Sequence, residues 1–260
     1  MNSAPELSRL RAIAEDSWYG RGVGARMVAY TFEVFRRYWR GKSVLELGPA
    51  EGIMTELLVP EFREVTVVDG AETFCEQLRQ RFPNITVVHS LFEDYAPAFR
   101  YDNIILGHVL EHVVNPVGVL SKVRDWLEPG GRLFAAVPNA RSIHRQAAVV
   151  LGLLHSEDEL NTTDLHHGHR RVYDPEQFRQ EFIKAGLRID VFGGYWLKPV
   201  SNQQIEETWS AEMLTAFMTL GERYPDIAAE IYVVCSIAGS TECGQERREC
   251  ETKSRAAPAL

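Results

Sequence analysis

Short apolar runs that alternate with helix-length segments limit the fold of this chain more than any other feature of its sequence. Each run is rich in Val, Ile and Leu and has the length of one strand. Five runs lie at 43–48, 65–70, 85–90, 103–109 and 132–139, and two more follow Gly186 and begin at Glu230. Strands separated by helical segments predict βαβ units and a mostly parallel sheet that is covered on both faces. We therefore expect a doubly wound α/β protein with seven strands.

The residues between these runs supply helix boundaries. Pro116 stands where a helix can begin, and the Glu-Pro-Gly-Gly sequence at 128–131 ends that helix before the strand that starts at Arg132. Asp174 and Pro175 fit the N-cap and first position of another helix, which Gly186 ends.

The alternation also predicts how the chain is divided. We expect a helical cap over residues 1–40, one α/β domain over 41–238, and a polar, disordered tail over 239–260. The rhythm of strands and helices breaks at 140–172, and a second, helical insertion spans 199–228. Long connections of this kind often carry binding sites, so 140–172 is a candidate for part of an acceptor site.

Charge and composition exclude several classes of protein. The formal net charge of −8 and the short basic clusters disfavour a nucleic acid partner. No apolar run approaches the roughly 18 residues of a membrane helix, and the first residues do not read as a signal peptide, so we expect a cytoplasmic protein that binds no membrane. The four cysteines form no CxxC pair and predict free thiols.

The turn after the first strand carries the clearest chemical signal. Glu46 to Gly52 (Glu-Leu-Gly-Pro-Ala-Glu-Gly) leads from strand to helix, where a glycine turn lets the backbone approach a ligand closely. Asp69 ends the second strand about twenty residues later, the position at which an acid binds ribose hydroxyls in nucleotide-binding sheets. The spacing of Gly48 and Gly52 differs from the Gly-x-Gly-x-x-Gly of dehydrogenases, which disfavours a nicotinamide cofactor.

With these motifs, residues 42–140 resemble the class I S-adenosylmethionine (SAM)-dependent methyltransferases, and a looser similarity continues through Ile237. The resemblance extends to small-molecule members such as the quinone-pathway and sugar O-methyltransferases. The family motif is Glu-x-Gly-x-Gly-x-Gly, and Ala50 replaces its central glycine. The resemblance implies a Rossmann-like sheet whose last strand is antiparallel, and SAM as the cofactor.

Carried over by position, the resemblance implies a set of cofactor-binding residues. Glu46 to Gly48 and Gly52 would face the methionine part, Asp69 would bind the ribose, and Leu91 and Phe92 would flank adenine. Trp18 and Tyr19 are candidates for a flap over the cofactor, although core packing or a homodimer contact explains them almost as well. The complete set is Tyr19, Glu46, Leu47, Gly48, Pro49, Gly52, Asp69, Gly70, Ala71, Leu91, Phe92 and Gly107.

Three titratable residues follow the fourth strand. His108, Glu111 and His112 are spaced i, i+3 and i+4, so a helical turn would project all three to one side, where they can hold a divalent ion. Similar placements of two acids and a histidine occur in quinone-pathway O-methyltransferases, some of which use magnesium, but here His108 replaces the first acid. The alternative is that Glu111 and His112 border the pocket without metal and His108 is a wall or a base.

A second cluster spans His166 to Tyr173, and within it His169 is our candidate for a catalytic histidine beside His108 and His112. A hydrogen-bonded loop that enters the following helix is the alternative interpretation. Trp196 and Lys198 are candidates for a pocket wall. Together these features predict methyl transfer to a hydroxyl of a small polar metabolite, a sugar or a phenol. An N-methyltransferase and a SAM-binding regulatory protein without turnover are the alternatives.

Overall fold

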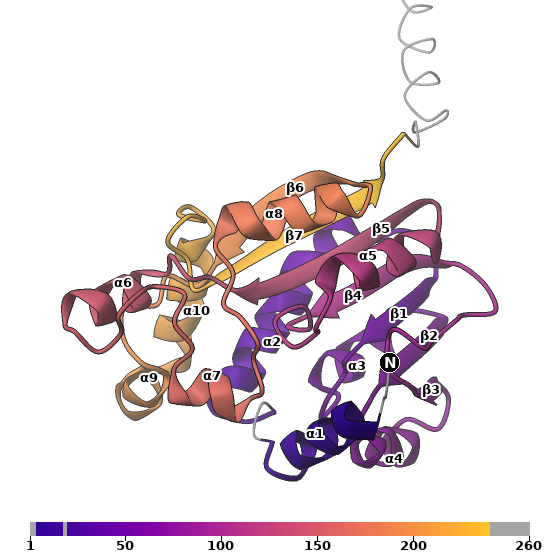
Figure 1. Cartoon of the computed structure of the whole chain (residues 1–260), viewed down its shortest axis with the longest axis horizontal. Helices are drawn as coiled ribbons and strands as arrows, with labels where there is room; N and C mark the ends of the chain where they lie inside the picture. The colour runs from indigo at the N-terminus through magenta and orange to yellow at the C-terminus, as the bar shows by residue number, and fades with distance from the viewer. Residues whose placement is uncertain (1–3, 18–19, 240–260) are drawn as a thin grey trace, which may run out of the picture.

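One seven-stranded sheet organises the protein. The computed structural model describes residues 4–17 and 20–239, and orders the strands β3-β2-β1-β4-β5-β7-β6 (Figure 1). The strands are β1 (Ser43–Leu47), β2 (Glu64–Asp69), β3 (Thr86–His89), β4 (Tyr101–Gly107), β5 (Leu127–Pro138), β6 (Leu187–Tyr195) and β7 (Glu230–Ile237). Only β7 runs antiparallel to its neighbours, β5 and β6. The predicted fold class, with its antiparallel last strand, is confirmed.

Helices cover both faces of the sheet, as predicted. The helices are α1 (Ala4–Glu15), α2 (Gly22–Phe35), α3 (Ile53–Leu58), α4 (Glu72–Arg81), α5 (Pro116–Asp125), α6 (Ile143–Val150), α7 (Thr162–His166), α8 (Pro175–Lys184), α9 (Asn202–Thr208) and α10 (Ala211–Gly221), with a 3₁₀ turn η1 (Arg36–Tyr38). One buried apolar cluster joins the sheet to α5 and α8. The other joins its opposite face to α2, α3, α9 and α10. Because both faces are covered, β1 is buried along its whole length and its burial does not alternate.

The predicted starts of α5 and α8 and the end of α8 agree with the structure, but the predicted end of α5 was wrong: the helix ends at Asp125, and residues 128–131 lie within β5. Asn115 caps α5, which begins at Pro116, and the Asp174 carboxylate accepts hydrogen bonds from the second and third residues of α8. Gly186 adopts a left-handed φ of 77° directly after α8. One strand start was wrong: β5 begins at Leu127 rather than Arg132, because Leu127 already pairs with Tyr101 across an irregularity in the β4–β5 register.

The segments that interrupt the alternation contain short helices. Residues 140–172 contain α6 and α7, and 199–228 contain α9 and α10, while α1, α2 and η1 precede the first strand. In Figure 1 α6, α7 and α9 lie together at one side of the molecule. In the described residues no helix has the length and apolar character that a membrane crossing needs. The expected tail lies almost entirely outside the described residues.

A close backbone approach at the end of β6 gives a first test of this packing. Trp196 has a φ of 67°, and its N–H donates to the Met218 carbonyl at 2.9 Å. A Cβ on Gly221 would lie 2.2 Å from the Trp196 nitrogen, and this backbone cannot move aside. We expect Gly221→Ala to lower the free energy of unfolding by about 2 kcal/mol or more.

Urea unfolding followed by circular dichroism measures this loss. Gly152→Ala is the control, because a Cβ there meets nothing within 4 Å; unlike Gly221, Gly152 has a positive φ. The free energy of unfolding of the control should fall only by the cost of a left-handed alanine, about 1 kcal/mol. Equal losses in the two variants would show that the contact with Trp196 does not matter.

Candidate active site

A cavity of about 560 Å³ lies at the carboxyl ends of β1, β2 and β4, the edge where doubly wound sheets bind ligands. Most of the residues predicted from the sequence line it: Glu46, Gly48, Pro49, Asp69, Gly70, Ala71, Leu91, Phe92, Gly107, His108 and His112. Residues from α1 and α2 complete the wall, among them Arg9, Leu10, Ile13 and Thr31. No sequence motif indicated that residues of α1 line the cavity, because their contacts with it depend on the tertiary path of the chain.

Six of the predicted residues do not line the cavity, Trp196 and Lys198 among them. Leu47 is fully buried in the core, so only its backbone can reach a ligand. Gly52 starts α3 rather than lining the cavity, and Glu111 and His169 are buried beside it. Trp18 and Tyr19 lie outside the described residues.

The turn after β1 is held in a left-handed conformation. Gly48 and Gly52 have φ values of 69° and 76°, and a Cβ on either would press within 3 Å of a neighbouring side chain. Ala50, which stands where the family motif has glycine, has a φ of 46°. A left-handed alanine costs about 1 to 2 kcal/mol, so the turn keeps its shape despite the substitution. The neighbouring contacts fix this backbone.

Two buried acids lie at the centre of the cavity wall. Asp69 accepts hydrogen bonds from the backbone N–H groups of Ala71 at 2.8 Å and Ala50 at 3.3 Å, and burial raises its pKa to about 6. Burial raises the pKa of Glu46 to about 8, with a smaller contribution from the charge of Asp69, against the hydrogen bond that Thr55 donates to it at 2.6 Å. Both acids are placed to accept hydrogen bonds from a ligand.

The charged side chains of the cavity wall are mostly acidic. Six acids and one arginine line the cavity: Glu6, Glu46, Glu51, Asp69, Glu93 and Asp94, with Arg9. Carboxylates at this density attract a cation and repel an anion such as a pyrophosphate. The charge of the site therefore disfavours a dinucleotide cofactor.

His108 occupies the far side of the cavity, in a turn rather than a helix, with a φ of 59°. Its Nδ1 lies 3.6 Å from Glu111 Oε1 and 3.8 Å from Glu230 Oε2, and its Nε2 lies 3.5 Å from the Tyr195 hydroxyl. Burial alone lowers the pKa of His108, but Glu111 and Glu230 outweigh it and raise the pKa. The sequence did not indicate Glu230, because its place beside His108 results from the order of the strands, in which β7 lies next to β5.

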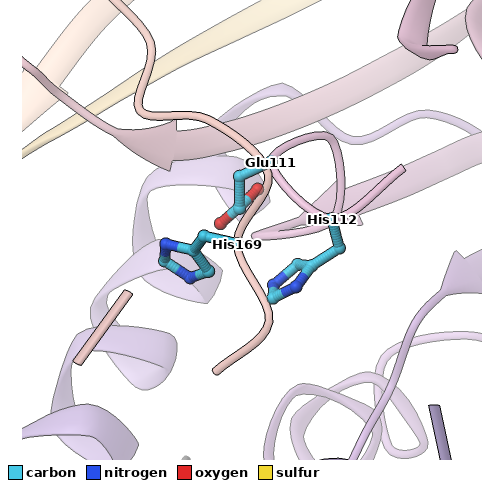
Figure 2. A group of neighbouring side chains, drawn as sticks. All are labelled: Glu111, His112 and His169. Atoms are coloured by element: carbon cyan, nitrogen blue, oxygen red, sulfur yellow. The ribbon is translucent and has the colours of Figure 1, made fainter. Parts of the chain in front are cut away.

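The three residues expected as metal ligands do not meet in one place. The group with metal-binding spacing is Glu111, His112 and His169, whose potential ligand atoms lie within 4.8 Å of one another (Figure 2). His108 lies outside this group because residues 108–112 form a turn, so the i, i+3, i+4 geometry of a helix does not apply. Burial lowers the pKa of His112 to about 4, which keeps its imidazole neutral.

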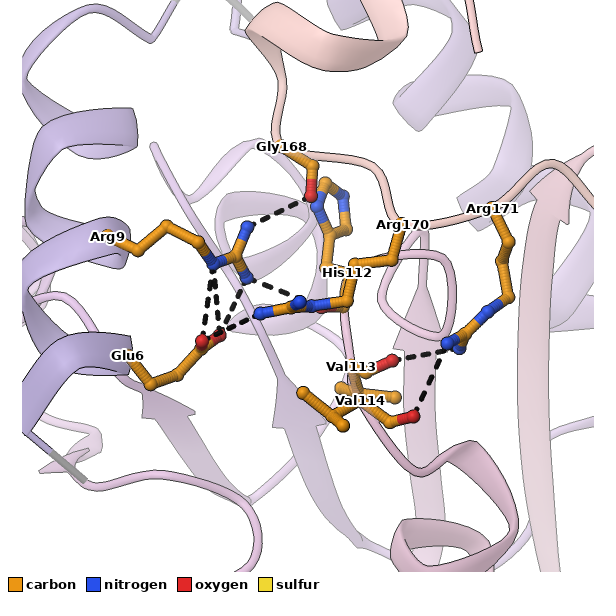
Figure 3. Close-up of polar contacts among 8 residues, drawn as sticks. All are labelled: Glu6, Arg9, His112, Val113, Val114, Gly168, Arg170 and Arg171. Atoms are coloured by element: carbon orange, nitrogen blue, oxygen red, sulfur yellow. Dashed lines mark hydrogen bonds and ion pairs between the residues drawn. The ribbon is translucent and has the colours of Figure 1, made fainter. Parts of the chain in front are cut away.

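Three arginines join α1 and the loop after α7 to the turn after β4 (Figure 3). Arg9 donates to the Gly168 carbonyl at 3.0 Å and to the His112 carbonyl at 3.3 Å, and Arg170 donates to the same His112 carbonyl at 2.8 Å. Both arginines also pair with Glu6 at 2.7 Å. Arg171 donates to the carbonyls of Leu110, Val113 and Val114. These contacts fix α1 over the cavity.

Comparison with known proteins agrees with this geometry. A family model described as a methyltransferase domain matches residues 25–190, which is more than half of the chain. The chain belongs to this methyltransferase domain family, and the class I SAM-dependent methyltransferase expected from the sequence is confirmed.

Among curated relatives, a ubiquinone biosynthesis O-methyltransferase of Vibrio parahaemolyticus serotype O3:K6 is 30% identical over 118 residues, 43% of this chain and 50% of the relative. The chain thus spans about half the length of the first curated relatives it matches. A protein of the same description from Coxiella burnetii is 26% identical over 211 residues, 76% of this chain and 88% of the relative.

Solved structures show the same fold. The N-methyltransferase NodS from Bradyrhizobium japonicum WM9, in complex with S-adenosylhomocysteine, aligns with a TM-score of 0.57 and 15% identity over 90% of this chain and 98% of its own. The glycopeptide N-methyltransferase MtfA complexed with SAM gives a TM-score of 0.54 and 15% identity over 82% and 87%.

The position of Asp69 predicts how cofactor binding depends on its charge. We expect Asp69→Asn to weaken the binding of S-adenosylhomocysteine about tenfold to a hundredfold, because a charged acceptor of the ribose hydroxyls is lost. The affinity of the unmodified protein should fall as the pH drops below about 6, where Asp69 becomes protonated.

Isothermal titration between about pH 5 and pH 8 measures both effects. Asp94→Asn is the matched control, since Asp94 lines the same cavity but is exposed and was not expected to bind the ribose. Unchanged affinity in Asp69→Asn would remove Asp69 from the cofactor site.

Proposed function

We propose that this methyltransferase transfers the methyl group of SAM to a hydroxyl of a small polar metabolite, a sugar or a phenol, with His108 as the general base. The observation that carries the proposal is the position of His108, a buried imidazole at the cavity wall with two carboxylates behind it. The O-methyltransferase relatives support the same acceptor chemistry.

The cavity accounts for each part of the cofactor. Asp69 takes the ribose hydroxyls, the turn from Glu46 to Gly48 faces the methionine part, and Leu91 and Phe92 provide an apolar surface for adenine. The surplus of acids around the cavity suits the positive charge of a sulfonium. SAM supplies an activated methyl group, so the protein has to align the acceptor, exclude water and remove a proton.

The surroundings of His108 suit the removal of that proton. A hydroxyl needs a base before it can attack, and an imidazole with a raised pKa is a stronger base than an ordinary histidine. When the methyl group leaves, the cofactor loses its positive charge and His108 gains one. Glu111 and Glu230 stabilise the imidazolium that forms.

An amine acceptor is the second candidate, because the acidic wall of the cavity also attracts an ammonium group. Incubation with SAM and matched pairs of hydroxyl and amine compounds separates the two reactions. Release of S-adenosylhomocysteine with the amines alone would overturn hydroxyl transfer. Cofactor binding without release on any compound would favour a regulatory protein.

Replacement of the proposed base tests the mechanism directly. We expect His108→Gln to lower kcat about a hundredfold to a thousandfold, since general base catalysis contributes rate factors of this size, and to leave S-adenosylhomocysteine affinity unchanged. His155→Gln is the control, because the His155 side chain is 98% exposed. Full activity in His108→Gln would exclude His108 as the base.

The pH dependence of kcat tests the role of the carboxylates. Only neutral imidazole accepts a proton, so kcat should rise with pH through the elevated pKa of His108. Glu230→Gln removes a negative charge that favours the imidazolium, which lowers the pKa of His108 and should move this rise to lower pH. An unmoved profile would show that Glu230 does not act on the base.

A further inference from the structure

The donor atoms beside the cavity do not fit the magnesium site that the quinone-pathway resemblance implies. Magnesium prefers oxygen ligands, but the group in this protein offers one carboxylate and two imidazoles, from Glu111, His112 and His169. His108 replaces the first acid of the family pattern and lies outside the group. One carboxylate with two imidazoles is a set that binds zinc and related transition-metal ions.

The three side chains come from two segments that are far apart in the sequence (Figure 2). Glu111 and His112 belong to the turn after β4, and His169 follows α7 in the inserted segment. Their potential ligand atoms lie within 4.8 Å of one another. Two ligand atoms on one tetrahedral zinc ion are about 3.4 Å apart, so a shift of up to about 1.4 Å closes the set.

Glu111 provides an independent sign that a cation belongs here. Its side chain has no exposed surface, and neither carboxylate oxygen has a hydrogen-bond partner in the part of the chain that the structure describes. The Nδ1 atom of His108 lies 3.6 Å from Glu111 Oε1, just beyond hydrogen-bond distance. Burial of a carboxylate without hydrogen bonds costs several kcal/mol, which a bound cation removes.

The backbone around the three side chains is already fixed. The Arg170 N–H donates to the Glu111 carbonyl at 2.8 Å, which joins the two segments directly beside the ligands. Arg9 and Arg170 both donate to the His112 carbonyl (Figure 3). A site whose ligands are held before the ion arrives binds it with a smaller loss of conformational entropy.

A second carboxylate supports His169 as a ligand. Asp164 Oδ1 lies 3.3 Å from His169 Nδ1, and the backbone N–H of His169 donates to the Asp164 carbonyl at 2.9 Å. Asp164 is held in turn by Arg145 at 3.1 Å and by the Asn161 N–H at 2.9 Å. A carboxylate that orients a histidine in this way is a recurrent neighbour of bound metal ions.

We propose that Glu111, His112 and His169 bind one divalent transition-metal ion of the zinc type, and not magnesium. The ion would tie the inserted segment to the turn after β4, beside the cavity that His112 lines. An ion with three protein ligands keeps one position open and can polarise an oxygen bound there. The proposal rests on the proposed function only in placing the ion beside the acceptor. Metal binding itself is measured without turnover.

Spectroscopic titration tests the site without an activity assay. The full chain is stripped with a chelator and titrated with Co²⁺, whose visible absorption reports the number and kind of ligands, then with Zn²⁺ in competition and with Mg²⁺. We expect one equivalent of Co²⁺ to bind, Zn²⁺ to displace it, and Mg²⁺ to bind at least about a hundredfold more weakly than Zn²⁺.

Variants identify the ligands. His169→Ala should weaken Co²⁺ binding at least about a hundredfold, and Asp164→Asn about tenfold to a hundredfold, because the orientation of His169 is lost. His155→Ala, from the same inserted segment but exposed, should bind Co²⁺ as the unmodified protein does. Thermal unfolding and S-adenosylhomocysteine binding of each stripped variant show whether it is folded.

Any of three results would overturn the proposal. One is Co²⁺ binding in folded His169→Ala that equals that of the unmodified protein. The second is Mg²⁺ binding as tight as that of Zn²⁺, and the third is no stoichiometric binding of any ion. Failure of hydroxyl methylation would leave these metal measurements unchanged, so the two hypotheses fail separately.

Discussion

The contact between Asp69 and two backbone N–H groups is the constraint on which the cavity depends. Asp69 ends β2, and the Gly48 N–H donates to the Val68 carbonyl at 2.9 Å, so the ends of β1 and β2 are locked in register. The Asp69 carboxylate then holds the turn after β1 through Ala50 and the turn after β2 through Ala71. The groups that shape the cofactor end therefore move as one unit. This dual contact also explains why a left-handed alanine is tolerated at position 50, where the local cost is offset by the fixed neighbours.

The parts of the site that follow directly from a strand could be predicted, and those brought in by folding could not. Gly48, Asp69 and His108 each come directly after or at the end of a strand, so the parallel sheet places them at one edge. Glu230 and the residues of α1 carry no local signal, because their place depends on the order of β5, β7 and β6 and on the path of the first helix. The same limit explains the residues proposed as metal ligands. The helical spacing in the sequence grouped His108 with Glu111 and His112. In the structure the third residue of the group is His169, which lies on a separate segment.

Charge links the two ends of the cavity. A sulfonium cofactor is positive before the reaction and neutral after it, while the proposed base becomes positive in the same step. In the proposed reaction, the acids of the wall near Asp69 and the pair behind His108 would therefore stabilise one positive charge at different times, first on the cofactor and then on the imidazole. A wall with basic residues would oppose both states, which is consistent with Arg9 being the single arginine among the lining residues of the described chain.

Glu111 lies between the two histidine systems and connects them. Its Oε1 is 3.6 Å from His108, and its carboxylate belongs to the group with His112 and His169. A divalent ion on this carboxylate would withdraw negative charge from His108, so Glu230, 3.8 Å away, would become the main group that raises the basicity of His108. His169 comes from the inserted segment. A change in the position of that segment would therefore alter the basicity of His108 through the ion and Glu111. The acceptor side of the cavity and the proton-accepting group are coupled in this arrangement by one buried carboxylate.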